Sequence, residues 1–108
     1  MRATIATLMI CLATAAQAQR ASCYGTEHHQ IRTATGEKYD PWRLTAAHKT
    51  LPLGTRVLVT NIANGRSVTV TINDRGPYVA GRSYDLSLGA CRAIGLSLGD
   101  VTAEVLGR

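Results

Sequence analysis

The sequence predicts a compact, mainly β domain, a small barrel that carries one short helix. Two runs rich in β-branched residues, Arg56 to Ile62 and Ser67 to Asn73, flank the dipeptide Asn64-Gly65, which is typical of type I′ hairpin turns. Apolar and polar residues alternate over 101–105, as expected of a last strand. Several short strands with a single helical segment favour a closed β architecture, whose topology periodicity alone does not predict.

The first residues are typical of a cleavable export signal. Arg2 provides the positive start, residues 3–16 are apolar apart from threonines, and Ala16-Gln17-Ala18 has the small-x-small pattern of a cleavage site. The apolar run is too short to cross a bilayer, and Cys11 lacks the small residue that precedes a lipidated cysteine. We therefore expect residues 1–18 to be a signal peptide, and the mature protein to have no membrane anchor.

The remaining part, residues 19–108, is small and moderately basic. Removing Arg2 from the 12 Lys and Arg residues leaves 11 of them against 7 Asp and Glu, an excess of four positive charges. Such a surface suits a polyanionic matrix such as a bacterial wall. Nucleic acid would suit the charge too, but one tryptophan, no phenylalanine and an export signal argue against it. We expect a periplasmic or secreted monomer.

Strands are expected in both halves of this domain. Ala21 to Gly25 and Thr45 to His48 are short strands separated by a polar loop. In the hairpin that follows, a two-residue loop at Asn64-Gly65 would put apolar pairs on one face and two threonines on the other. The pairs expected are Val59 with Val70, Val57 with Ile72, and Thr60 with Thr69.

One helix is expected over Leu88 to Ile94. Ser87 precedes it as an N-cap, and Gly95 follows at the position where a left-handed residue ends a helix. Leu98-Gly99-Asp100 is then typical of a turn before the last strand.

Cys23 and Cys91 remain after removal of the signal. In an oxidising compartment an isolated pair is most simply a disulfide. It would close a loop of nearly the whole domain, worth about 4 kcal/mol in the chain-entropy model. A catalytic Cys–His pair is the alternative, but neither cysteine has the His or helix-start context that favours a thiolate.

Ionisable residues gather in three segments: Thr33 to Pro41, Leu44 to Pro52 and Asn73 to Pro77. Glu37 and Asp40 belong to a turn-rich loop, His48 follows small residues in an extended run, and Asp74 closes a strand before a Gly-Pro turn. Each segment has a structural alternative: a turn cap for Asp40, a hydrogen-bonded structural His48, and an Asp74–Arg75 pair that fixes the turn. Residue types alone do not separate catalytic acids from such structural groups.

Five blocks of the sequence together resemble the rare lipoprotein A family. They are Ala21 to Gly25 (ASCYG), Thr33 to Asp40 (TATGEKYD), Leu44 to Gly54 (LTAAHKTLPLG), Asn73 to Pro77 (NDRGP) and Gly81 to Ser87 (GRSYDLS). The blocks occur in the family's order, and the resemblance covers essentially all of residues 21–106. The third and fourth blocks form a highly specific combination.

The resemblance implies a six-stranded double-psi β-barrel with one or two short helices and a groove for glycan chains, similar in fold to expansins. It also implies an endolytic lytic transglycosylase, a carbon–oxygen lyase that cleaves peptidoglycan glycan strands between N-acetylmuramic acid and N-acetylglucosamine. In this reaction the sugar's own 6-hydroxyl displaces its neighbour and leaves an anhydro-muramic end. No cofactor or metal is implied.

By position, Glu37, Asp40, His48 and Asp74 match the family's polar groove residues, and Asp85 matches an expansin groove aspartate. Glycosidic cleavage needs a proton on the leaving oxygen and a stabilised oxocarbenium-like centre. One carboxyl group can act as acid and then as base if its surroundings raise its pKa. We assign that role to Asp74 first and Asp85 second, and expect the other three to position the sugar, tune the proton or share the transfer. Further substrate contacts are expected from Tyr24, Thr33, Lys49, Arg75 and Tyr78.

Two departures from the family pattern involve the cysteines. Cys23 replaces the aromatic residue usual in the first block, and Cys91 lies in a helix normally rich in alanine, so the paired change supports a disulfide. A cation site made by His28-His29 with His48 is not expected, because adjacent loop histidines are usually exposed. Two other function classes fit the same blocks: a non-catalytic expansin-like module that binds glycan or loosens the wall, and a small secreted inhibitor.

Overall fold

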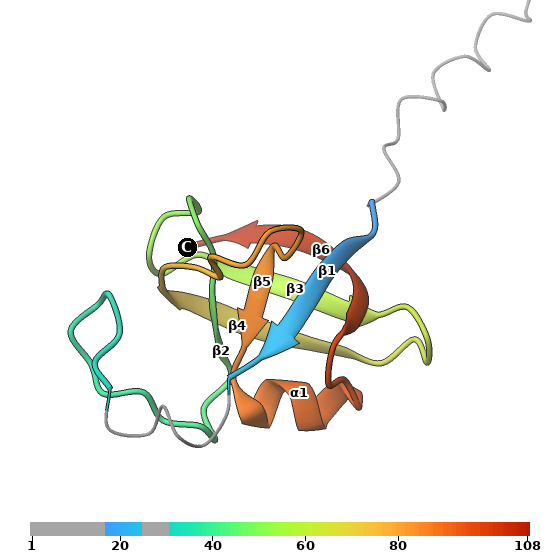
Figure 1. The fold of residues 1–108 in the computed structure, drawn as a ribbon, viewed down its shortest axis with the longest axis horizontal. Helices are drawn as coiled ribbons and strands as arrows, with labels where there is room; N and C mark the ends of the chain where they lie inside the picture. The colour runs from blue at the N-terminus through green and yellow to red at the C-terminus, as the bar shows by residue number, and fades with distance from the viewer. Residues whose placement is uncertain (1–16, 25–30) are drawn as a thin grey trace, which may run out of the picture.

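Six strands close into a barrel whose one end is covered by a helix (Figure 1). The computed structural model describes residues 17–24 and 31–108, so residues 1–16 of the expected signal peptide and the His28-His29 pair lie outside the described residues. The elements are β1 Gln19–Cys23, β2 Thr45–Ala47, β3 Arg56–Asn61, β4 Ser67–Asp74, β5 Tyr84–Leu86, α1 Leu88–Ile94 and β6 Gly99–Gly107. Their order around the barrel, β1-β5-β2-β4-β3-β6, confirms the mainly β class and is that of a double-psi barrel.

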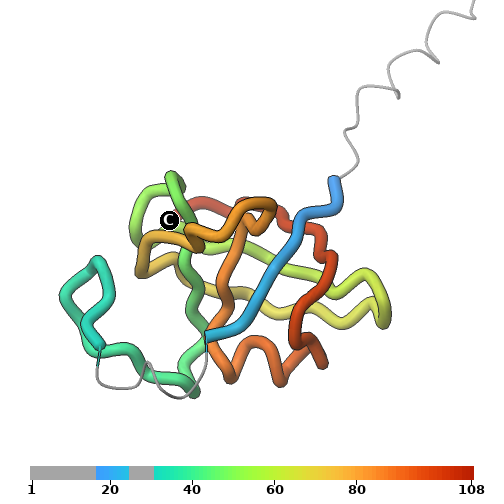
Figure 2. The backbone as a smooth tube through the Cα atoms, viewed as in Figure 1, coloured from blue at the N-terminus to red at the C-terminus, as the bar shows by residue number. Residues whose placement is uncertain are grey.

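The barrel order brings together segments that are far apart in the sequence. β5 lies between β1 and β2, parallel to the first and antiparallel to the second, while β2 also runs parallel to β4. Figure 2 shows the N-terminal strand and the strand of residues 84–86 side by side. Ser22 and Asp85, which are 63 positions apart, are therefore direct neighbours.

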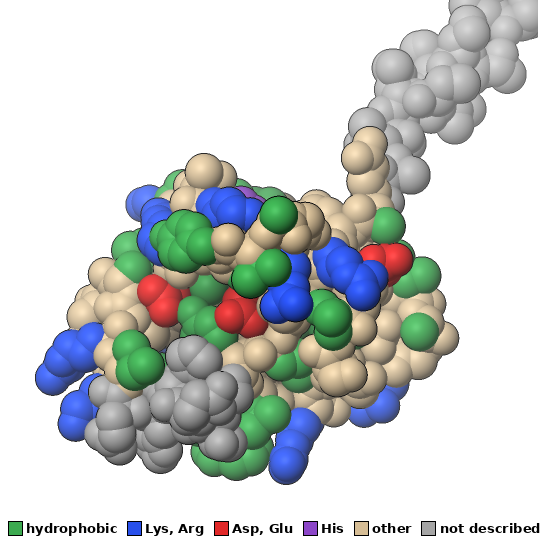
Figure 3. All heavy atoms as spheres, viewed as in Figure 1, with side chains coloured by type: hydrophobic (Ala, Val, Ile, Leu, Met, Phe, Trp, Pro, Cys, Tyr) green, Lys and Arg blue, Asp and Glu red, His purple; other side chains and the backbone are tan. Residues whose placement is uncertain are grey.

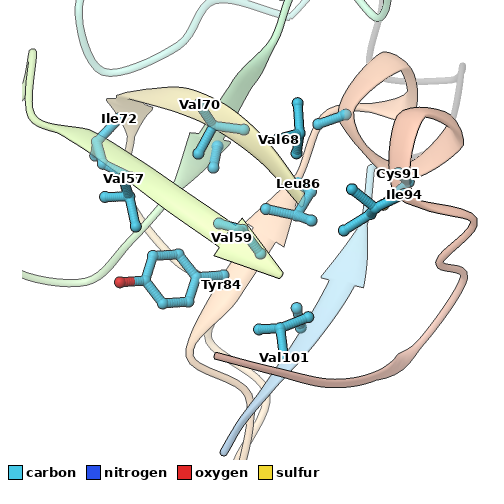
Figure 4. Packing of buried hydrophobic residues seen from close by; sticks show 13 residues of the cluster. Val57, Val59, Val68, Val70, Ile72, Tyr84, Leu86, Cys91, Ile94 and Val101 are labelled. Atoms are coloured by element: carbon cyan, nitrogen blue, oxygen red, sulfur yellow. The ribbon is translucent and has the colours of Figure 1, made fainter. Parts of the chain in front are cut away.

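Alternate residues of the strands fill the barrel interior. From β3 and β4 these are Val57, Val59, Val68, Val70 and Ile72 (Figure 4). Leu86 of β5 and Ile94 of α1, both fully buried, complete the same cluster. Each such side chain stabilises the fold by about 1.5–3 kcal/mol when removed from water. Because side chains fill the interior, a ligand site has to be built on the outside of the barrel.

The helix follows the sequence prediction. Ser87 caps α1, with its Oγ accepting a hydrogen bond from the Ala90 amide at 3.2 Å. Gly95 ends the helix in the left-handed conformation, with φ of 64°. Across the described part of the chain, no helix has the length and apolar character needed to cross a membrane.

The predicted hairpin forms, but its register was wrong by two residues. A shift of two preserves the face on which each side chain lies, so the predicted valines are still the buried ones. The observed pairs are Val57 with Val70, Val59 with Val68, Leu58 with Thr69, and Thr60 with Ser67.

Asn61 explains the difference, because it closes a wider loop than Asn64-Gly65 alone. Its amide donates to the Arg66 carbonyl, and its own carbonyl accepts from the Gly65 amide, each at 2.8 Å. Its buried side chain donates to the Ile94 carbonyl at 2.8 Å, which ties the loop to the end of α1. This long-range contact, which local turn preferences do not contain, sets the loop length.

Strand ends differ modestly from the prediction elsewhere. The expected turn at Leu98-Gly99-Asp100 was wrong in part, since Gly99 and Asp100 already belong to β6 and pair with β1. β6 pairs first with β1 and then with β3, and this double pairing closes the barrel. The two early strands form close to their predicted positions, whereas the three-residue β5 was not recognised as a strand.

Cys23 and Cys91 form the predicted disulfide, with Cα atoms 6.3 Å apart. The bond joins the end of β1 to α1, and the two residues are 68 positions apart. It therefore closes a loop of most of the domain.

Replacing both cysteines by serine is expected to lower the free energy of unfolding by about 2–4 kcal/mol, because the denatured chain regains the entropy of a long loop. Denaturant unfolding monitored by circular dichroism measures the change. Reductant should shift the midpoint of the wild-type protein toward that of the double variant and leave the variant unchanged. Equal midpoints for the oxidised wild type and the variant would contradict the expectation.

Candidate functional site

Two of the predicted acids, Asp74 and Asp85, lie on either side of Ala47. Ala47 of β2 pairs with Asp74 of β4 and with Asp85 of β5. Directly opposed residues in a sheet point to the same face, and strands are spaced by about 4.8 Å, so the two acidic Cα atoms lie roughly 10 Å apart. The adjacent pair Ala46 and Leu86 points into the core, so the two acids belong to the outer face of the barrel.

Asp74 reaches this face through a β-bulge. Ile72 pairs with Ala46, but the next residue of β2, Ala47, pairs with Asp74, so that Asn73 is an extra residue in β4. A bulge changes which way the following side chain points. Without it, Asp74 would share the inward direction of Ile72; with it, Asp74 lies beside Ala47 and Asp85.

The Asp74 carboxylate accepts three hydrogen bonds. The Tyr24 hydroxyl donates to Oδ2 at 2.7 Å, and the amides of Ala34 and Arg75 donate to Oδ1 at 3.0 and 2.8 Å. The side chain of Arg75 turns elsewhere, so the alternative of an Asp74–Arg75 ion pair was wrong. Asp74 remains partly exposed. It is therefore a firmly oriented carboxylate with access to solvent.

Tyr24 links the two acids. Burial, followed by the hydrogen bond to Asp74 and the charges of Asp74 and Asp85, raises the pKa of the Tyr24 phenol far above its ordinary value. The phenol therefore stays protonated and remains a hydrogen-bond donor at any physiological pH. Its ring meets that of the buried Tyr39 edge-on, with centroids 4.8 Å apart, which holds it in place.

Asp85 has a neighbour that the sequence reasoning did not name as a site residue. The Ser22 hydroxyl donates to Asp85 Oδ1 at 3.0 Å, from the position directly opposite on β1. Ser22 could have been found from its place in the first conserved block, one residue before Cys23. It orients the second carboxylate much as Tyr24 orients the first.

Glu37 and Asp40 have local partners on the loop that leads into β2. Glu37 Oε2 lies 3.3 Å from Arg43 Nη1, and Glu37 Oε1 accepts from the Thr35 hydroxyl at 3.2 Å. Asp40 accepts the Trp42 amide at 2.9 Å, which is the turn cap that the structural alternative described. The contacts of these two acids are therefore within their own loop, and neither acid contacts Asp74 in the described contacts.

Thr33, predicted to bind substrate, is buried within the same loop. Its hydroxyl lies 2.9 Å from the Thr35 hydroxyl and donates to the Glu37 carbonyl at 3.1 Å. Its contacts hold the loop that delivers the Ala34 amide to Asp74.

His48 lies on the other side of β2 from the acid pair. Its ring packs against that of Tyr84, with centroids 4.9 Å apart, and its Nδ1 accepts the amides of Thr50 and Leu51 at 3.1 and 3.0 Å. The neutral ring thus carries its proton on Nε2. Burial first, and then the charges of Lys49 and Arg75, lower the pKa of His48 below its ordinary value.

Three other residues predicted to contact the substrate, Lys49, Arg75 and Tyr78, lie on the loops that follow β2 and β4. We call these three residues the rim. Arg75 donates to the carbonyls of His48 and Leu51, the latter at 2.7 Å, and Lys49 donates to the Arg82 carbonyl at 2.8 Å. Tyr78 stands on the loop that these bonds secure and is 80% exposed. On the face shown in Figure 3, Lys and Arg side chains gather along a rim above acidic side chains.

A separate pocket of about 350 Å³ lies at the opposite end of the hairpin, between residues 61–63 and 95–100. It contains none of the predicted site residues, and its position gives no reason to move the site from the acid pair. Among the described residues, no group of three or more His, Cys, Asp and Glu side chains is arranged to hold a metal ion.

Comparison with known proteins identifies close sequence relatives. A family model described as "Lytic transglycolase" matches residues 16–105. A Synechocystis relative, "Probable endolytic peptidoglycan transglycosylase RlpA", is 55% identical over 89 residues, which cover 80% of this chain and 28% of the relative. The Campylobacter jejuni "Endolytic peptidoglycan transglycosylase RlpA" is 49% identical over 90 residues, covering 81% and 33%. The chain thus spans about a third or less of the length of these relatives.

Two solved structures share the fold at low sequence identity. The "Streptomyces papain inhibitor (SPI)" has a TM-score of 0.61 at 20% identity, over 82% of this chain and 94% of that one. Cerato-platanin 3 from M. perniciosa has a TM-score of 0.54 at 16% identity, over 83% and 94%. At such identities the likeness concerns the barrel alone.

The environment of His48 predicts a pH-dependent stability. The unfolded state takes up the His48 proton near pH 6.5, while the folded state resists it, so stability is complete above that pH and falls as pH drops through 6.5 toward the lower folded pKa. His48→Asn keeps an acceptor for the two amides and removes the titration. We expect the wild type to lose stability relative to this variant between about pH 7 and 5.

Thermal unfolding of both proteins across this range measures the difference, and an NMR titration identifies His48 by its absence in the variant spectrum. A His48 midpoint at or above 6.5 would show that its environment has been misjudged.

Proposed function

We infer the function of this chain from its family, because the chain belongs to the RlpA-like lytic transglycolases. We propose that it is an endolytic peptidoglycan lytic transglycosylase, which cleaves glycan strands between N-acetylmuramic acid and N-acetylglucosamine outside the cytoplasm. The observation that carries this proposal is the pair of outward-facing acids, Asp74 and Asp85, with the Tyr24 phenol hydrogen-bonded to the first and within the electrostatic influence of the second. Nucleic acid and a membrane anchor are not part of the proposal.

The proposed reaction moves one proton and consumes no water. The 6-hydroxyl oxygen of the muramic sugar attacks its own C1, the bond from C1 to the neighbouring glucosamine oxygen breaks, and the hydroxyl proton ends on that leaving oxygen. One carboxyl group can hold the proton between these two positions. The products are an anhydro-muramic end and a free glucosamine 4-hydroxyl.

Asp74 is the most firmly oriented of the predicted acids, and we assign the proton transfer to it on that ground. Its carboxylate accepts hydrogen bonds from the Arg75 amide at the end of β4, the Ala34 amide of a neighbouring loop and the Tyr24 hydroxyl just beyond β1. The orientation of Asp74 is therefore fixed before substrate binds. We assign Asp85, two strand spacings away, to stabilise the positive charge that develops at C1. The sugar ring would lie against the partly exposed carboxylates of these two acids, since Ala47 between them is covered by other protein atoms.

The remaining predicted residues are assigned to holding the sugar. Glu37 and Asp40 would hold the sugar from the loop that leads into β2. Tyr78 and Lys49 would hold it from the loops that follow β4 and β2. His48 lies on the other side of β2, so it can act on the sugar only through the segment of residues 48–51, whose amides its Nδ1 accepts.

The Asp74→Asn variant is expected to lose about a hundredfold or more of its activity, because an amide cannot take up or return the proton. The assay is incubation with peptide-free glycan strands followed by mass spectrometry of anhydro-ended fragments. Asp100→Asn is the matched control, since Asp100 is an exposed acid paired with Arg20 on another part of the barrel. Binding by wild type without any anhydro ends would instead favour the expansin-like module.

The Tyr24→Phe variant is expected to reduce turnover about tenfold, since a hydrogen bond to a charged group is worth about 1.5–3 kcal/mol. The ring and its contact with Tyr39 are kept, so the melting temperature should change little while kcat falls and KM stays close to that of wild type. A wild-type kcat in Tyr24→Phe would remove the phenol from the proposed mechanism.

A further inference from the structure

Trp42 is an exposed aromatic residue that the proposed chemistry does not use. It is the only tryptophan of the sequence, and it is 56% exposed although its backbone lies against the protein. The guanidinium of Arg92, from α1, lies over its ring at 5.1 Å from the centroid. The rest of the indole remains open to solvent.

The turn that carries Trp42 is held rigidly. Asp40 accepts the Trp42 amide, and the Gly89 amide of α1 donates to the Pro41 carbonyl at 2.7 Å. Gly89 allows this approach, because a Cβ there would lie 2.8 Å from the Trp42 carbonyl oxygen. An aromatic surface on a fixed base loses little conformational entropy on binding a ligand.

An ion pair and a ring contact connect this turn with the surroundings of the acid pair. Arg43, the residue after Trp42, pairs with Glu37 on the loop wall. Tyr39, three residues before Trp42, meets Tyr24, whose hydroxyl donates to Asp74. The turn of Trp42 is therefore joined to the loop that carries Glu37 and to the ring pair beside Asp74.

The charge of Arg92 adds a second kind of recognition. Within the described ranges no carboxylate pairs with Arg92, whereas Arg43 and Arg20 each have an acidic partner. A guanidinium beside an open indole fits a ligand that has both an apolar ring face and a carboxylate. A pyranose ring offers the first through its C–H bonds, and the lactyl group of a muramic sugar offers the second where its peptide has been removed.

We propose that Trp42 and Arg92 form a distal sugar subsite, in which the indole stacks on a pyranose ring and the guanidinium pairs with the carboxylate of a muramic acid unit. The inference rests on the proposed function, since it assigns this subsite to the same glycan. It makes Trp42 a binding residue with no part in proton transfer.

The single tryptophan makes the subsite directly observable. Its fluorescence is followed while the Asp74→Asn protein, which does not consume the ligand, is titrated with peptide-free glycan strands or with neutral chitohexaose. We expect a change in Trp42 emission that saturates with the calorimetric binding curve for both ligands. Calorimetric binding without a change in emission, or no binding of either ligand, would overturn the subsite.

Variants separate the two contacts. Trp42→Ala should weaken both ligands about five- to tenfold, as expected for loss of one stacking surface. Arg92→Gln should weaken the binding of the glycan strands alone, by up to about fivefold. The difference in affinity between the glycan strands and chitohexaose should then no longer depend on salt. Leu98→Ala and Arg66→Gln are the controls, since both residues are exposed elsewhere and should leave affinity unchanged.

The outcomes distinguish this inference from the proposed function. If wild type produces anhydro ends and Trp42→Ala does so with unchanged KM and affinity, the subsite is refuted and the enzyme stands. If wild type produces no anhydro ends but Trp42 emission still reports binding, the enzyme is refuted and the subsite stands.

Discussion

The pairing of Ala47 with both Asp74 and Asp85 is the constraint on which the site depends. A central strand with one small, fully buried residue holds two acids from separate strands at a fixed spacing. Neither acid is close to Ala47 in the sequence, and neither would face the other without β2 between their strands. Because Ala47 is fully buried, a larger side chain at position 47 would have to displace its neighbours and would disturb the spacing of the two acids.

Hydroxyl and amide donors then orient the two acids. Tyr24 and Ser22, two residues apart on and just beyond β1, each donate to one of the two carboxylates. Such donors fix the direction of each carboxylate and stabilise its negative charge without adding the formal positive charge of an ion pair. The disulfide at Cys23, between these two donors, anchors them to α1. The segment Ser22 to Tyr24 therefore contributes both to the stability of the fold and to the orientation of the two acids.

Much of the fold could be predicted from local patterns, because the signals involved are local. Ser87 and Gly95 cap α1 within the helix itself, and alternation marks the buried faces of β3 and β4. The hairpin register could not be predicted, because Asn61 sets it by bonding to the far end of α1. β5 escaped recognition because three residues are too few to show a period.

The site could be predicted in part for the same reason. Residue type and family position identified Asp74 and Asp85, which the barrel brings to one face. They could not show that a bulge at Asn73 turns Asp74 outward, or that His48, one residue after Ala47, points to the other side of the strand. Asp40, identified in the same way, turned out to cap the turn of Trp42. Alternation along a strand points the side chains of successive residues to opposite faces. Pairing between strands brings together side chains of residues that are far apart in the sequence.

The number of strands explains why the chemistry must lie outside the barrel. Eight strands leave an interior that side chains just fill, so a six-stranded barrel has no room for a ligand. A glycan can then bind only across the outer surface, where a strand alone offers a flat face and no walls. The loop of residues 31–44 and the rim after β4 supply those walls, and each is fastened to the barrel through backbone groups. In the proposed function these two segments would border a long polymer, and an exposed aromatic residue such as Trp42 would add a contact for that polymer away from the acids.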